Sequence, residues 1–69
     1  MNDSEFSPDN IIKSVAADIA SLSADDVTTV VEKANDMGRA IDMGDYLAEH
    51  RPDLEDAIED AVGAALARF

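Results

Sequence analysis

Apolar residues recur at intervals of three and four positions along the last segment of the chain, from Pro52 to Phe69. This is the period of an amphipathic helix, in which one stripe of side chains faces the core. Pro52 suits the first helical position, and the carboxylates after it face the positive end of the helix dipole. We therefore predict a helix over residues 52–68 that forms one wall of the core. Its apolar stripe consists of Leu54, Ala57, Ile58, Ala61, Val62, Ala65, Leu66 and Phe69.

A first helix is predicted over residues 8–22. Ser7 is an N-cap residue type, and Pro8 follows it at the first helical position. Residues 1–6 are expected to form a frayed N-terminus, although Phe6 and Ile11 have the spacing of a hydrophobic staple. The buried stripe of this helix is predicted to contain Ile11, Ile12, Val15, Ala16, Ile19 and Leu22.

A second helix is predicted over residues 24–37. Ser23 and Asp26 have the spacing of a capping box. The run from Val27 to Val31 is β-branched throughout and also has strand propensity, but its apolar spacing is that of a helix. Gly38 is expected to end the helix in a left-handed conformation, the alternative being a helix that continues through Ile41. The predicted stripe consists of Val27, Val30, Val31, Ala34, Met37 and Ile41.

A short third helix is predicted over residues 43–51, with Asp42 as its N-cap. It must end before Pro52, because the residue before a proline avoids the helical region. Tyr46 is expected to lie in the core with its hydroxyl at the surface, and both Met37 and Met43 to fill gaps in the core or at its rim. The sequence therefore predicts an all-α fold, a compact small bundle of three to four short helices in a single domain spanning residues 1–69.

The size and charge of the chain narrow the classes of partner. It has 69 residues, no cysteine, and a net charge of −11 from 16 acidic and 5 basic residues. So short a chain buries a small core, and self-association or a bound partner would add to its stability. The negative surface repels nucleic acid and anionic membranes and favours a basic partner. Neither a signal peptide nor a membrane-spanning stretch is visible, so we expect a cytoplasmic location.

Five carboxylates gather in the first half of the last predicted helix without an intervening Lys or Arg. One interpretation is a solvated outer face, and the other is a surface that binds a basic partner. A calcium site is rejected because calcium loops place oxygen ligands on a turn with a glycine at a fixed position. The candidate partner-binding residues are Asp53, Glu55, Asp56, Glu59 and Asp60.

No catalytic, cofactor or metal site is predicted. His50 is the only histidine and there is no cysteine, so the ligands of a zinc site are missing. The sequence also lacks a serine on a strained turn beside this histidine, as a catalytic triad would need. His50 is instead expected to lie near a helix C-terminus, where a cation is favoured. We therefore expect a protein that is not an enzyme and needs no cofactor.

Two functions from different classes follow from the pattern. The first is a small regulator or inhibitor whose carboxylates engage the basic surface of a protein partner, including a nucleic-acid-binding one, without binding nucleic acid itself. The alternative is a self-associating or docking module, such as a homodimer, that works through its apolar helix faces. Gly63, among alanines, would let a second helix approach closely. The candidate dimer seam consists of Leu54, Ile58, Val62, Leu66 and Phe69.

Overall fold

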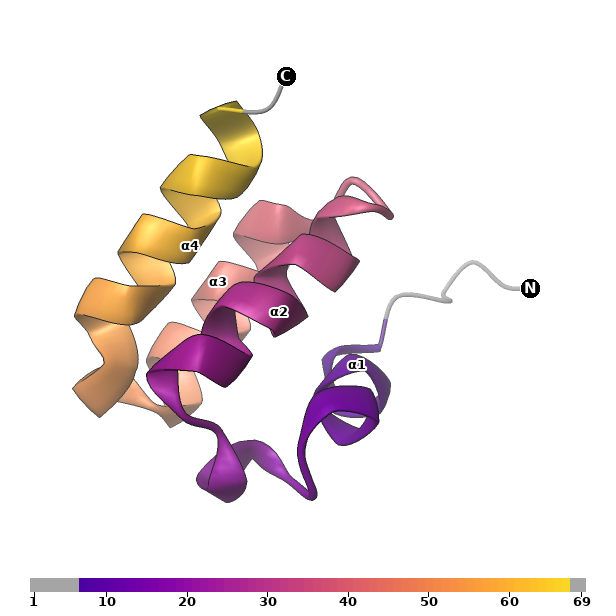
Figure 1. Ribbon diagram of the computed structural model, residues 1–69, viewed down its shortest axis with the longest axis vertical. Helices are drawn as coiled ribbons and strands as arrows, with labels where there is room; N and C mark the ends of the chain where they lie inside the picture. The colour runs from indigo at the N-terminus through magenta and orange to yellow at the C-terminus, as the bar shows by residue number, and fades with distance from the viewer. Residues whose placement is uncertain (1–6, 68–69) are drawn as a thin grey trace.

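Four α-helices and two short 3-10 turns make up residues 7–67, the part of the chain that the computed structural model describes (Figure 1). These residues contain no strand, so the all-α prediction is confirmed. The segment predicted to be frayed, Phe6 of the predicted staple and Phe69 of the predicted seam lie outside the described residues. The elements are α1 (Pro8–Val15), η2 (Ile19–Ser21), α2 (Ala24–Asn35), α3 (Ala40–His50), η3 (Pro52–Leu54) and α4 (Glu55–Ala67).

The N-caps of the first two helices are those that the sequence predicts. The Asn10 amide donates to the Ser7 hydroxyl over 3.5 Å, and Pro8 opens α1. At the start of α2, the Asp26 amide donates to the Ser23 hydroxyl over 3.3 Å. The Asp26 carboxylate in return accepts from the Ser23 amide over 3.2 Å, which completes a capping box. These caps help to fix the β-branched run as a helix.

Gly38 ends the second helix as predicted. Its φ of 73° lies in the left-handed region that glycine adopts without steric cost. The Gly38 amide donates to the Asn35 carbonyl over 2.9 Å, and the Arg39 amide donates to the Ala34 carbonyl over 2.9 Å. This pair of bonds is a Schellman motif, and it turns the chain sharply toward α3.

The prediction of a first helix through residue 22 is wrong, because α1 ends at Val15. Ala16 is extended, with φ −142° and ψ 175°. Beyond it, the Asp18 carboxylate accepts from the Ser21 amide at 3.0 Å and from the Ser21 hydroxyl at 3.1 Å. Asp and Ser side chains that bond nearby backbone groups compete with a helix. The competing bonds here build the separate turn η2.

The third helix begins three residues earlier than predicted, at Ala40 rather than Met43. Asp42 is therefore not an N-cap. It lies in the first turn of α3 and forms an ion pair with Arg39 over 3.2 Å. Because Ile41 now belongs to α3, it leaves the predicted stripe of α2 and is 57% exposed. Met37 is also mainly exposed, whereas Met43 is fully buried as expected.

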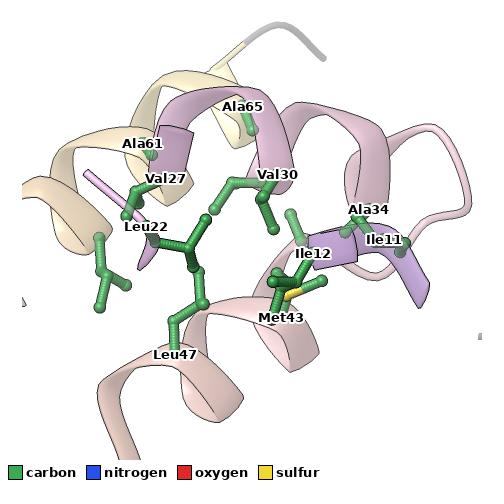
Figure 2. Packing of buried hydrophobic residues seen from close by; sticks show 13 residues of the cluster. Ile11, Ile12, Leu22, Val27, Val30, Ala34, Met43, Leu47, Ala61 and Ala65 are labelled. Carbon is green, nitrogen blue, oxygen red and sulfur yellow. The ribbon is translucent and has the colours of Figure 1, made fainter. Parts of the chain in front are cut away.

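The central element of the core is α2, which contacts each of the other three α-helices. Figure 1 shows α4 beside α2 and α3 behind α2. The helix α1 lies near the C-terminal half of α2, where Ile11 is beside Ala34 in Figure 2. In Figure 2, Met43 and Leu47 of α3 point toward Val30 of α2. The prediction that the last helix forms one wall of the core is confirmed. Its buried contribution is modest, however, and consists of Ile58, Ala61 and Ala65.

One arginine ties the two halves of the chain together. Arg51, between α3 and α4, donates through one terminal nitrogen to the carbonyl oxygens of Ile19, Ala20 and Leu22, at 2.8, 3.1 and 3.3 Å. These carbonyls belong to η2 and its C-cap, and that of Ile19 also accepts from the Leu22 amide over 3.3 Å. The Arg51 side chain thereby holds the α1–α2 connection against the start of the last helix.

Candidate partner-binding surface

Four of the five predicted acidic residues share the exposed surface of α4. Glu55 and Glu59 are one helical turn apart, and so are Asp56 and Asp60. Within residues 7–67, none of the four takes part in an ion pair or a side-chain hydrogen bond. Like charges at this spacing repel each other by a few tenths of a kcal/mol. A partner that brought cations to this surface would remove that repulsion.

Asp53 differs from these four residues because it is already neutralised. Its two carboxylate oxygens accept from Nε of Arg51 at 3.0 Å and from a terminal nitrogen of Arg51 at 2.8 Å. This bidentate bond lowers the pKa of Asp53 and raises that of Arg51. Asp53 therefore orients the Arg51 side chain that binds the carbonyls of η2. This bidentate bond separates Asp53 from the other four residues of the predicted binding set.

Asp45 of α3 joins the acidic surface, although the sequence reading did not include it. Together with Glu55 and Glu59, it lines a hollow between α3 and α4. We call this hollow the α3–α4 groove. The helical spacing of Asp45 was present in the sequence, because this residue follows Ile41 by four positions and precedes Ala48 by three. This spacing places the three residues on one face of α3. The groove has a volume of about 410 Å³ and is lined by Ile41, Gly44, Asp45, Ala48, Glu55, Ile58, Glu59, Val62 and Gly63.

The residues of the predicted dimer seam are separated by the fold. Ile58 is only 4% exposed and belongs to the intrachain core, while Leu54 and Val62 are half-buried against it. Leu66 is 43% exposed. Its side chain lines a second hollow, which also includes Ile41 and Arg39. Of the seam residues that the structure describes, Leu66 is therefore the one whose side chain lies largely on the surface.

The polar and aromatic side chains around His50 form a small cluster on α3. The centroid of the His50 ring lies 4.4 Å from that of the Tyr46 ring. His50 is in the last turn of α3, at the helix C-terminus where it was predicted. The Tyr46 hydroxyl donates to the Asp9 carboxylate over 2.7 Å and so connects α3 to α1. This bond, with burial and the negative charge of Asp9, raises the pKa of Tyr46. Tyr46 is half-buried with its hydroxyl exposed.

No group of three or more His, Cys, Asp or Glu side chains within residues 7–67 is arranged to hold a metal ion. None of the helices in this part of the chain is long and apolar enough to cross a membrane.

No protein-family model, curated protein or solved structure matches this chain at a significant level.

Proposed function

We propose that this chain is a non-catalytic acidic binding protein, a regulator or inhibitor that engages the basic surface of a protein partner. The observation that carries the proposal is a set of exposed carboxylates on α4 that have no cation within residues 7–67. These residues are Glu55, Asp56, Glu59 and Asp60. Asp53 is left out of the binding set because Arg51 already neutralises it.

The energetic basis of the proposal is that these carboxylates are in water and unpaired before binding. Breaking an internal ion pair would cancel much of the gain from a new one, and these four residues have none to break. The net charge of −11 adds a long-range attraction for Lys and Arg side chains and accelerates encounter. Carboxylates in rows also imitate the charge of a phosphate backbone. A nucleic-acid-binding protein of the cytoplasm is therefore the partner class that we propose.

A salt-dependent capture experiment tests this function. The purified chain is immobilised, exposed to cell extract, and washed with salt rising from about 0.05 to about 0.5 M, a range over which the screening length falls severalfold. We expect basic, nucleic-acid-binding proteins that elute as the salt rises and that free nucleic acid displaces. The double variant Glu55→Lys/Glu59→Lys should lose them.

A matched control carries the same change in charge elsewhere. Asp36 and Glu49 are exposed and lie at or near the C-terminal ends of α2 and α3, where a lysine suits the helix dipole. Asp36→Lys/Glu49→Lys should retain most of the binding. Equal losses from both double variants would show that only the net charge matters and that α4 is not the binding surface.

A second candidate function is the self-associating or docking module, and it is supported by three exposed apolar side chains. Met37, Ile41 and Leu66 are 54%, 57% and 43% exposed. Leu66→Asp is the cleaner test of this function than Leu54→Asp, because Leu54 is half-buried and its substitution would also disturb the fold. Sedimentation that shows a dimer, and a Leu66→Asp variant that is monomeric, would favour this function over the first.

A further inference from the structure

The floor of the α3–α4 groove is apolar, and a glycine in it lets the two helices pack closely. A Cβ atom on Gly44 would lie 2.7 Å from Cγ2 of Val62, so only glycine permits α4 to approach this closely. Ile58 and Val62 of α4 and Ala48 of α3 line the hollow beside this contact. Ile41 contributes a side chain that is more than half exposed. The groove therefore leaves apolar surface in water.

The polar lining of the groove is acidic on both sides. Asp45 projects from α3, and Glu55 and Glu59 project from α4. No Lys, Arg or His lines the groove, and none of the three carboxylates is paired within residues 7–67. A second copy of this chain would bring its own excess of acid toward this lining, whereas a basic segment would neutralise it.

We propose that the α3–α4 groove binds an amphipathic helix of a partner protein, with apolar side chains on its inner face and Lys or Arg along both edges of that face. This proposal rests on the proposed function and deepens it, because it assigns the partner an apolar anchor and a helical shape. The inner face would cover Ile41, Val62 and Gly63, and the flanking cations would meet Asp45 on one side and Glu55 and Glu59 on the other.

The spacing of the lining residues supports a helical occupant. On α3 they follow the pattern i, i+3, i+4, i+7 from Ile41, and on α4 the pattern i, i+3, i+4, i+7, i+8 from Glu55. Each helix thus offers one continuous face to the hollow. Two such faces form the type of groove into which a third helix packs with its own apolar face.

Defined peptides serve as probes. The first is a fluorescent peptide of about five helical turns, with leucines on one face and lysines elsewhere. The second has the same composition in scrambled order, and the third replaces each lysine of the first by glutamate. Fluorescence anisotropy measures the Kd of each peptide for the full chain. We expect the first peptide to bind at least about tenfold more tightly than the scrambled one, since only the first can bury its leucines together.

Two substitutions alter the groove without changing its charge. Gly63→Gln fills it from a position where an added Cβ would meet no atom within 4 Å, and Ala64→Gln is the matched control on an exposed neighbour that does not line the groove. Ile41→Ser removes the exposed apolar side chain, and Met37→Ser is its control, because Met37 is comparably exposed outside the groove. Gly63→Gln and Ile41→Ser should reduce the affinity of the amphipathic peptide to that of the scrambled one.

The results separate this proposal from the proposed function. If the scrambled peptide binds as tightly as the first, and Glu55→Lys/Glu59→Lys weakens both while Gly63→Gln has no effect, the groove proposal is wrong and the acidic-surface function stands. If no basic peptide binds while the salt-dependent capture succeeds, the groove proposal is wrong and the acidic-surface function stands, and if both experiments fail, both are wrong. Equal binding of the glutamate peptide would refute the basic character of the occupant. A dimer in sedimentation that Gly63→Gln dissociates would make a second copy the occupant and would also overturn this proposal.

Discussion

Two glycines in helix interiors are expected to respond in opposite ways to the same substitution. Replacing an interior helical glycine by alanine stabilises a helix by about 0.5–1 kcal/mol, chiefly by reducing the freedom of the unfolded chain. At Gly63 nothing lies within 4 Å of the added Cβ, so Gly63→Ala should gain this amount. At Gly44 the added Cβ would lie 2.7 Å from Cγ2 of Val62. A contact that short must be relieved by movement.

The size of the steric cost at Gly44 follows from the neighbour that has to move. Val62 is β-branched and strongly prefers one rotamer in a helix, so it relieves the contact only if α3 and α4 separate slightly. Overpacking of this kind costs about 1–3 kcal/mol. After subtracting the gain of about 1 kcal/mol from helix propensity, Gly44→Ala should lower the free energy of unfolding by up to about 2 kcal/mol.

A double-mutant cycle isolates this contact. Val62→Ala removes Cγ2, and the remaining neighbours, Ile58 Cγ2 at 3.7 Å and the Cβ of residue 62 at 3.9 Å, are at ordinary contact distances. In the Val62→Ala background, Gly44→Ala should therefore become stabilising, with a coupling free energy of about 1–3 kcal/mol. Urea denaturation measures each variant, and a Gly63→Ala background keeps the weakest variants folded. If Gly44→Ala raises the urea midpoint as much as Gly63→Ala does, α3 and α4 are not packed as described.

Three further outcomes can be measured on the isolated protein. Ile58→Ala should cost about 2–5 kcal/mol because it empties a buried position, whereas Leu66→Ala should stay within about 0.5 kcal/mol, and equal losses would contradict the burial pattern. Tyr46 is the only tyrosine, so its absorbance titration reports one group, and Asp9→Asn should lower its raised pKa toward 10.0. Because the pKa of Tyr46 is higher in the folded than in the unfolded chain, its hydrogen bond to Asp9 contributes stability below pH 10. This stability is lost as the pH rises through the folded pKa. An unchanged Tyr46 titration in Asp9→Asn would exclude the bond. Raising the salt to a physiological level should increase the Tm by screening the net charge of −11, and a fall would mean that attractive pairs dominate.

Local signals in the sequence predicted the parts of the fold that depend on neighbouring residues. The capping box of Ser23 and Asp26, the N-cap Ser7 and the left-handed Gly38 each act within a few positions, so their residue types suffice. The apolar period also identified the buried residues of α2 and α4, although the predicted stripes included Met37, Ile41 and Leu66, which the structure leaves exposed. These features decided the fold class, because each of them favours a helix over a strand.

The errors arose where distant parts of the chain meet. Periodicity extended the first helix to residue 22, but the structure ends it at Val15 and places η2 under Arg51, a contact made across 29 to 32 positions of sequence. Ile41 was assigned to the stripe of the second helix because its spacing fits both helices. The start of α3 at Ala40 decides between them. The α3–α4 groove could not be predicted for the same reason, since it requires both helices in register.

Residues that were grouped by sequence proximity were also divided by tertiary contacts. Asp53 and Glu55 are two positions apart in the acidic run, yet Arg51 engages only Asp53. Likewise, Ile58 and Leu66 occupy equivalent positions of one apolar stripe, but the other helices cover Ile58 and leave Leu66 exposed. Periodicity identifies the face of a helix, and the reach of the neighbouring elements decides how much of that face is buried.

The most direct test of the proposed acidic binding function is the rate of association with the captured partner, measured by stopped-flow fluorescence over a range of ionic strength. Opposed charges act mainly on this rate and on its dependence on salt. We predict that Glu55→Lys/Glu59→Lys slows association and flattens its salt dependence, while Leu66→Asp leaves the salt dependence largely as it is in the unmodified chain. Unchanged association kinetics in the lysine variant, together with loss of the complex in Leu66→Asp, would contradict the proposal and assign binding to the apolar faces.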